Sequence, residues 1–445
     1  MTTRYTHFIF ESYHYAADTG TLSLNYAYQD GPSFCEEIVL PLPSGQLSAS
    51  DRHILDRLFR LLFLLAGVSY YKAYAPLHLA CQAFAIDPAT AAFVEKLYRN
   101  GLAEFAFCNR ITVGPRFTDT PCEPLKPLSR KTSKRVLVPI GGGKDSCVAL
   151  ECLRRSGHDT VLFALHSADG LAEPIKDTIR IAGLPVITTE RRLDSGLTIL
   201  TDAYNGHVPV TAILSVVALC SAVLQNLGAV VMANEHSANA PNLTQGDQDV
   251  NHQYSKSLEF EEDLDLYVKA YVCDNLTYVS LLRPLTEAAI AQKFTTLEAY
   301  HPVFCSCNTA FRQNAATRGK TWCNACPKCR FVFLAMAPFM DKQALIAIFG
   351  LNLLNNSEQE DGFAALCGLD THKPFECVGE THESALLLLH LSALPDWQDD
   401  VVIKALTPRL SAHYPLSAIQ FVDLFDMRTP HRVPYALLET LDAVG

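Results

Sequence analysis

A short glycine-rich segment contains the residues whose types point most directly to chemistry. It lies between the apolar run RVLVPI and the helical pattern CVALECLRR and consists of Gly141, Gly142, Gly143, Lys144, Asp145 and Ser146. Glycines let the backbone approach a ligand closely, and amides at the start of a helix attract phosphate. The spacing fits neither G-x-x-x-x-G-K-[ST] nor G-x-G-x-x-G. We therefore predict a polyphosphate-binding turn of another type; the alternative is a glycine-rich turn that binds nothing.

A cysteine cluster is the second candidate site. Five of the 15 cysteines lie between residues 305 and 329, as CSC and then CNACPKC. Thiolates spaced C-x2-C-x2-C can close on one tetrahedral ion, and a fourth cysteine completes a structural zinc site. We predict the ligands to be Cys307, Cys323, Cys326 and Cys329, with Cys305 as the alternative to Cys307. An iron–sulfur cluster and a set of buried free thiols are the competing interpretations.

The polar run VNHQYSKSLEFEED, residues 250–263, shows no clear amphipathic period. Loops at the carboxyl edge of a parallel sheet are where substrates bind, so His252 and Lys256 are candidates for proton transfer or carboxylate binding. The alternative is a solvated loop. Glu261, Glu262 and Asp263 in particular look like a surface acidic run.

The elements that position these residues follow from the hydrophobic pattern. Residues 5–42 alternate like a β-meander, residues 50–100 have helical periodicity, and residues 118–134 have linker composition. From residue 134, nearly continuous apolar runs alternate with helices, as in a buried, doubly wound parallel sheet. We predict an N-terminal α+β domain at 1–128, an α/β domain at 129–300, a Cys-rich metal module at 301–340 and a helical C-terminal region at 341–445.

Composition narrows the class of protein. The formal net charge is -11, from 47 Asp and Glu against 36 Lys and Arg, so no general attraction to nucleic acid or anionic lipid is expected. The N-terminal MTTRYTHFIF lacks a secretory pattern, and the odd cysteine count suits a reducing compartment.

The apolar stretch from Val208 to Ala233 is better explained by a buried helix and a short strand than by a membrane span. We expect a cytoplasmic protein with neither nucleic acid nor membrane as partner; nothing in the sequence indicates an oligomeric state.

The segment GGGKDS resembles the S-G-G-x-D-S loop of the PP-loop ATP pyrophosphatases, with Gly141 in place of the first Ser. Two further similar elements follow in the same order, Asn234-Glu235-His236 after a strand and Arg283-Pro284-Leu285 between a strand and a helix. The resemblance implies a doubly wound PP-loop core in which the segment 141–146 holds the phosphates of ATP. It also implies that Asp145 interacts with Mg²⁺. Lys144 and Arg283 would neutralise negative charge as the bond between the α and β phosphates breaks.

With the β-rich N-terminal region, NHQYSKSLEFE and WCNACPKCRFVFLAMAPF, these motifs closely resemble the UDP-N-acetyl-α-D-muramoyl-L-alanyl-L-glutamate epimerase family over most of the chain. The resemblance implies ATP- and Mg²⁺-dependent inversion of the terminal L-Glu of a UDP-muramoyl dipeptide through an adenylated carboxylate, with release of AMP and diphosphate. His252 and Lys256 remain the candidates for proton transfer, with Cys147 and Cys305 as alternatives. Two other functions stay open: a tRNA-modifying PP-loop enzyme, against which the acidic balance counts, and a non-catalytic nucleotide-sensing protein.

Overall fold

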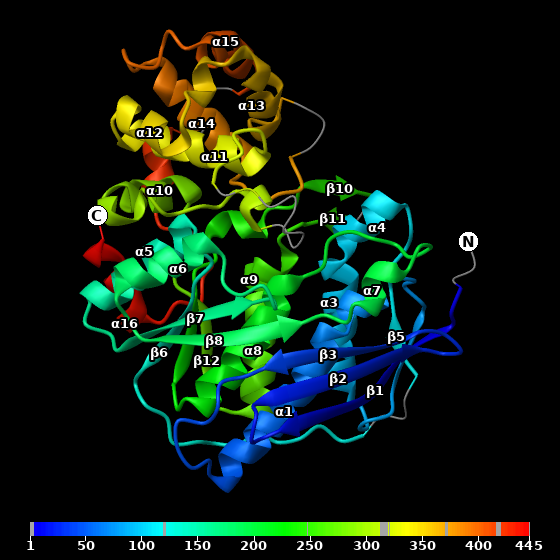
Figure 1. The fold of residues 1–445 in the computed structure, drawn as a ribbon. Coiled ribbons are helices and arrows are strands. Elements are labelled where there is room, and N and C mark those ends of the chain that lie inside the picture. Colours follow the sequence, from blue (N-terminus) through cyan, green and yellow to red (C-terminus); the bar gives the residue numbers. More distant parts are fainter. Residues whose placement is uncertain are drawn as a thin grey trace.

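The computed structural model describes residues 4–118, 122–246, 248–311, 319, 321–369, 373–414 and 420–444. The structure is α/β, with one large sheet in the body of the molecule and a helical C-terminal region stacked beside it (Figure 1). The ten strands of the sheet follow the order β12-β9-β6-β7-β8-β3-β2-β1-β4-β5. A separate two-stranded ribbon pairs β10 (Leu243–Gln245) with β11 (Gln248–Val250).

One half of the sheet is parallel and confirms the predicted alternation of strands and helices, although of the strand at residues 186–192 only Thr189 is buried. Its strands are β6 (Val136–Pro139), β7 (Thr160–His166), β8 (Val186–Arg192), β9 (Ala229–Met232) and β12 (Thr277–Ser280). All their neighbouring pairs are parallel. The chain order reverses between β6 and β9, and ligands of doubly wound sheets bind at the carboxyl ends of strands at such a reversal. The glycine segment follows β6, and the turn 234–236 follows β9.

The other half of the sheet is the predicted β-meander with two short strands added. It contains β1 (His7–Ala16), β2 (Thr21–Tyr28), β3 (Ser33–Val39), β4 (His78–Cys81) and β5 (Arg116–Phe117). Strand β3 pairs antiparallel with β8, and Arg191 Nε donates to the buried Glu36 across this junction at 2.7 Å. The region 1–128 was predicted as a domain of its own, but its strands, between His7 and Phe117, share one continuous sheet with the α/β part.

Helices cover both faces of the sheet and enclose two hydrophobic cores. One core contains the apolar sides of α1 (Ala49–Ala66), α3 (Pro88–Gly101), α8 (Val210–Leu224) and α9 (Leu258–Tyr267), with α2 (Val68–Tyr71) and α4 (Ala103–Asn109) beside them. The other contains α5 (Lys144–Arg155), α6 (Glu173–Ala182) and α10 (Glu287–Thr295). A short helix, α7 (Gly196–Ile199), follows β8. Helix α8 is the helix expected in the long apolar stretch, and no described helix has both the length and the apolar character to cross a bilayer.

The C-terminal region is helical, as predicted, and the described residues after 331 contain no strand. Its helices are α11 (Pro327–Met336), α12 (Lys342–Phe349), α13 (Glu360–Leu366), α14 (Thr381–Ser392), α15 (Val401–His413) and α16 (Tyr435–Leu438). Helix α11 packs on α10, so this region extends the second core rather than forming a detached body (Figure 1).

The interpretation of Glu261, Glu262 and Asp263 as a surface acidic run is wrong for Glu261, whereas Glu262 and Asp263 are partly exposed. Ser257 caps the start of α9 by accepting a hydrogen bond from the amide of Phe260 at 3.2 Å. Glu261 points inward, is 1% exposed, and pairs with Arg283 at 3.0 Å. A buried carboxylate is tolerated here because a buried guanidinium neutralises it, which residue spacing alone does not reveal.

Candidate active site

The glycine segment connects the end of β6 to the start of α5. Gly142 has φ +76°, and a Cβ atom there would lie 3.0 Å from Pro174, so this position needs glycine both for its conformation and for space. Gly143 is the extended N-cap residue of α5 and carries no side chain to occupy the first amides of the helix. No side chain caps these amides, and uncapped amides at the start of a helix can bind an anionic ligand.

Lys144 and Asp145 lie at the base of this turn with a third residue, Glu287, that sequence reasoning missed. Lys144 is fully buried, and its ammonium forms ion pairs with both carboxylates. Burial raises the pKa of Glu287, whereas in Asp145 the ammonium groups of Lys144 and Lys328 outweigh the effect of burial and lower the pKa. Asp145 therefore stays ionised. Glu287 is the first residue of α10 and lies two residues after the Arg283-Pro284-Leu285 segment that the sequence analysis singled out.

One atom of Glu287 is not satisfied within the protein. Its Oε1 is buried and has no hydrogen-bond partner among the described residues, while Oε2 contacts Lys144. Buried acceptors without a partner are rare, and a cation or a water molecule is their usual partner. The Asp145 and Glu287 carboxylates thus offer oxygen ligands of the kind that Mg²⁺ prefers.

Arg283 donates hydrogen bonds to residues outside the glycine segment. The side chain is fully buried and donates to Glu261 and to the main-chain carbonyls of Glu235 and Lys256. Because the guanidinium is buried and bonded to these groups, this arrangement gives no support to the expected contact between Arg283 and phosphate. Arg283 instead holds the turn after β9 and the segment before α9 in place.

Lys256 and His252 do come together, around a thiol that the sequence did not point to. Lys256 Nζ lies 3.3 Å from the Sγ of Cys377, and His252 hydrogen-bonds the same thiol. His252 Nδ1 also contacts the carboxylate of Glu104, from α4. Lys328, the residue before the last cysteine of CNACPKC, donates to the carbonyl of Cys377. Cys377 stands alone in FECVGE, where no spacing marks it.

The charges around Cys377 change its acidity and that of its neighbours. Burial alone would raise the pKa of this thiol, but Lys256, His252 and Lys328 outweigh burial and lower the pKa to about 6. Burial likewise opposes protonation of His252, yet its contacts with Cys377 and Glu104 raise the pKa of the imidazole to about 9. At neutral pH the arrangement therefore favours a thiolate beside protonated Lys256 and His252.

The two cysteines that we had considered as bases lie in different surroundings. Cys147 is fully buried within α5, and burial raises the pKa of its thiol. Cys305 is buried beside the glycine segment, where its amide donates to the carbonyl of Gly142 at 2.9 Å, and burial raises its pKa as well. Neither thiol has the cationic neighbours that favour a thiolate at Cys377.

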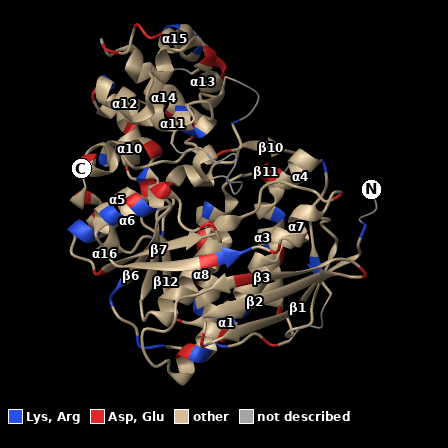
Figure 2. Ribbon diagram, viewed as in Figure 1, with Lys and Arg blue, Asp and Glu red and all other residues tan. Residues whose placement is uncertain are grey.

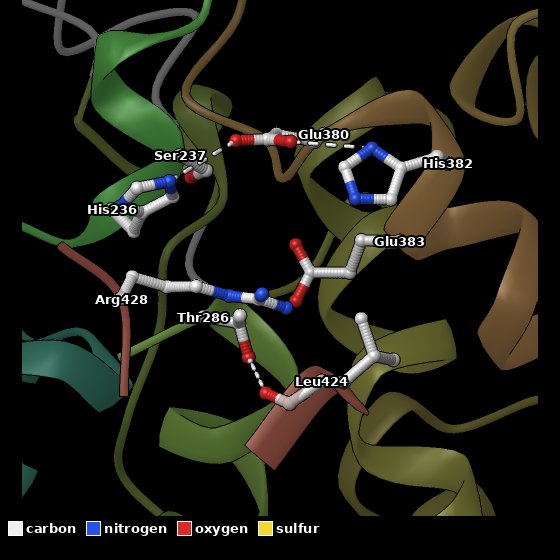
Figure 3. Close-up of a pocket in the computed structure, with 8 residues that line it drawn as sticks. All are labelled: His236, Ser237, Thr286, Glu380, His382, Glu383, Leu424 and Arg428. Atoms are coloured by element: carbon white, nitrogen blue, oxygen red, sulfur yellow. Dashed lines mark hydrogen bonds and ion pairs between the residues drawn. The ribbon is translucent and has the colours of Figure 1, made fainter. Parts of the chain in front are cut away.

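A polar cavity adjoins the start of α10 (Figure 3). It is lined by His236, Ser237, Thr286, Glu380, His382, Glu383, Leu424 and Arg428. The Arg428 guanidinium extends into it beside the carboxylate of Glu383, and Glu380 lies between the two histidines (Figure 3). Burial and the nearby charge of Glu287 raise the pKa of Glu383 to about 8, so this carboxyl is mainly protonated at neutral pH. The cavity thus presents both donors and acceptors to a polar ligand.

A buried lysine, Lys373, lies close to carboxylates of both the cavity and the candidate Mg²⁺ site. Lys373 is 6% exposed, and its Nζ has no hydrogen-bond partner among the described residues. Glu380, Glu235 and Glu287 are close enough to act on its charge, although burial outweighs them and lowers its pKa. An ammonium group held here without a partner can receive an anionic group of a ligand.

The four predicted metal ligands lie together. The thiols of Cys307, Cys323, Cys326 and Cys329 offer sulfur atoms within 4.8 Å of one another. The Sγ of Cys329 lies 3.7 Å from that of Cys323 and 3.5 Å from that of Cys326. Four thiolates at ~2.3 Å from one tetrahedral ion are separated by about 3.8 Å, so this spacing suits a single ion. Cys305 is not part of the group.

Comparisons with known proteins match nearly the whole chain. A family described as MurL N-terminal domain matches residues 1–281, and one described as MurL C-terminal domain matches residues 303–419. Proteins named UDP-N-acetyl-alpha-D-muramoyl-L-alanyl-L-glutamate epimerase are similar over most of their length. The protein from Micromonospora sp. is 41% identical over 96% of both chains. The one from Xanthomonas oryzae pv. oryzae is 38% identical over 96% of this chain and 95% of its own. The one from Salinispora tropica is 41% identical over 90% and 88%.

Proposed function

The chain belongs to the MurL family, and on that premise we propose that it is an epimerase that inverts the terminal L-glutamate of UDP-N-acetylmuramoyl-L-alanyl-L-glutamate to D-glutamate. The relatives carry this activity in their names and are similar to almost the entire chain. We further propose that the reaction uses ATP. The observation that supports this step is the turn at residues 141–146, with free helix amides beside Asp145 and Glu287.

The chemistry explains why activation is needed. Removing the Cα proton beside a free carboxylate would place a second negative charge next to the first. In the proposed reaction a carboxylate oxygen of the glutamate attacks the α-phosphorus of ATP, the α–β phosphate bond breaks, and diphosphate leaves. In the resulting acyl-adenylate the former carboxylate no longer carries a negative charge, so Cα–H is more acidic. A base can then take this proton, and another group can return one from the opposite face. Water then cleaves the mixed anhydride to AMP and the D-glutamyl product.

We assign a separate role in this reaction to each group at or near the turn. The amides at the start of α5 would bind phosphate oxygens, and Lys373 would offset their charge. Asp145 and Glu287 would hold Mg²⁺, which fits the unpartnered Oε1 of Glu287. When bound, this ion supplies charge neutralisation on the phosphates. Lys144 keeps the two carboxylates at a common position through its paired contacts.

A direct test uses ATP, Mg²⁺ and UDP-N-acetylmuramoyl-L-alanyl-L-glutamate as substrates. We expect AMP and D-glutamate to form together, measured by AMP release and by the chirality of glutamate after acid hydrolysis. Asp145→Asn should reduce both by at least ~100-fold, because it removes a charged oxygen ligand. Asp177→Asn, on the exposed side of α6, is the matched control and should leave both unchanged. AMP without D-glutamate would contradict epimerisation while leaving adenylation standing.

We also propose that the four clustered thiols bind one structural zinc ion. Their compact spacing supports a single ion, because a multi-iron cluster places its own sulfides between the thiolates and spreads them. The ion would fix Cys307 and so the neighbouring Cys305, whose amide donates to the carbonyl of Gly142.

A further inference from the structure

We propose that Cys377 is the catalytic base that removes the Cα proton of the activated glutamate, with Lys256, His252 and Glu104 as its positioning residues. The inference rests on the proposed function, since the proton becomes acidic only after the carboxylate is activated. It assigns the proton-transfer step to a residue that neither the sequence motifs nor the predicted site included.

The geometry around the thiol is that of an activated cysteine. Lys256 Nζ lies 3.3 Å from Sγ, and the ring of His252 hydrogen-bonds the same sulfur. Glu104 contacts His252 at Nδ1 and so orients the ring. A thiol, an imidazole and a carboxylate in series form the arrangement that generates reactive thiolates in enzymes. Cys377 is also partly exposed, whereas Cys147, Cys220 and Cys367 are fully buried.

The position of Cys377 matches the second half of the proposed reaction. The ammonium of Lys256 acts on the charge of both Cys377 and Asp145, and the ammonium of Lys328 does the same. The thiol and Asp145 of the phosphate turn therefore share two cationic neighbours, Lys256 and Lys328. A base for Cα must lie in such a place, because Cα is one bond away from the carboxylate carbon that the turn would activate.

The step can be written in full. The thiolate of Cys377 takes the Cα proton, and the electron pair of the C–H bond moves into the acyl-adenylate to form its enolate. A donor that exchanges with solvent then protonates Cα from the opposite face, which gives the D configuration. The thiol returns its proton to solvent, and the thiolate is restored beside Lys256 and His252. No oxidant or reductant takes part.

The test separates activation from proton transfer. Substrate-dependent exchange of labelled diphosphate into ATP reports adenylation, and deuterium incorporation at the glutamate Cα in D2O reports proton transfer. Cys377→Ser should lose at least ~100-fold in deuterium incorporation while its diphosphate exchange stays within about threefold of wild type. Cys377→Ala should behave in the same way, and Cys122→Ser, at an exposed cysteine, should match wild type in both assays. A circular dichroism melt confirms that each variant is folded.

Each of the following outcomes would contradict either the assignment of Cys377 as the base or the proposed adenylation. Normal deuterium incorporation in Cys377→Ser would show that another group is the base. A loss of diphosphate exchange as large as the loss of deuterium incorporation, in a folded variant, would assign the thiol to activation instead. A glutamyl thioester on Cys377, detected by mass spectrometry of acid-quenched enzyme, would make it a nucleophile rather than a base. Absence of diphosphate exchange in the wild-type enzyme would contradict the proposed adenylation. A loss of deuterium incorporation confined to the Cys377 variants would in that case still assign the thiol as the base, for a substrate activated in another way.

Discussion

At the scale of single residues, the site depends on charges that are buried next to one another. Lys144 lies between Asp145 and Glu287, and Arg283 pairs with Glu261. Removing one partner of such a pair leaves an uncompensated buried charge and typically costs about 3–5 kcal/mol. The candidate site therefore uses its ion pairs to keep carboxylates and turns in place. Glu287 Oε1, which has no partner within the described part of the chain, remains available for a ligand.

Glu383 makes the stability of the protein depend on pH in a defined direction. Its folded pKa of about 8 lies above the ordinary value of 4.5, so the folded state keeps a proton that the unfolded chain has released. This favourable contribution is complete below about pH 4.5 and is lost as pH rises towards 8, by at most about 1.4 kcal/mol per pH unit.

Glu383→Gln mimics the protonated side chain and should remove this dependence. The free energy of unfolding of Glu383→Gln should equal that of wild type at pH 5 and exceed that of wild type at pH 8. Urea denaturation at both pH values measures it. Glu298→Gln, at an exposed position, is the control and should follow the wild-type curve. A Glu383→Gln difference that is the same at both pH values would contradict the assignment.

At the scale of elements, the site is built where strands end and helices begin. The glycine segment follows β6, the turn 234–236 follows β9, and Glu287 opens α10 after β12. Parallel strands bring these three ends to one edge of the sheet, so residues about 50 to 150 positions apart converge. Cys377 is added from outside the sheet, on the segment that precedes α14.

Two neighbouring glycines of the turn should respond differently to the same substitution. Gly142→Ala forces a side chain into a left-handed conformation 3.0 Å from Pro174 and should cost about 1–3 kcal/mol of stability. It should also weaken ATP binding, because the amides of the turn move. Gly141→Ala should preserve both, since its added Cβ would meet no atom within 4 Å. Thermal melts with and without ATP measure the two effects, and equal behaviour of the two variants would contradict this view of the turn.

At the scale of the whole molecule, the site joins three regions that are far apart in the chain. Glu104 comes from the N-terminal half, Lys256 from the α/β part, and Lys328 and Cys377 from the C-terminal region. In the described part of the chain, Lys and Arg are interspersed with Asp and Glu (Figure 2). The active arrangement therefore requires the C-terminal region to be docked on the sheet.

The proposed zinc ion should control this docking. We expect about one zinc per chain by elemental analysis, and Cys326→Ser or a strong chelator should remove it and lower the melting temperature. Loss of the ion should also reduce epimerisation, because Lys328 lies between two of the ligands and contacts Cys377. Cys305→Ser should retain the zinc. Iron with inorganic sulfide, or zinc retained in Cys326→Ser, would contradict the assignment.

The sequence by itself determined the local features of this protein. The alternation of apolar runs predicted the parallel strands, glycines after RVLVPI predicted the turn, and C-x2-C-x2-C predicted a thiol cluster that Cys307 does join. These features depend on short spacings along the chain, which backbone geometry converts directly into structure.

Only the tertiary structure decided which charges meet. Glu287 at Lys144, Glu261 at Arg283, and Cys377 between Lys256 and His252 are contacts between residues about 20 to 140 positions apart. The pairing of β3 with β8, which joins the N-terminal strands and the parallel strands in one sheet, was likewise decided only by the tertiary structure. No local pattern encodes such contacts, because burial and pairing depend on how the strands and helices pack. A lone cysteine or glutamate therefore acquires its role only after folding.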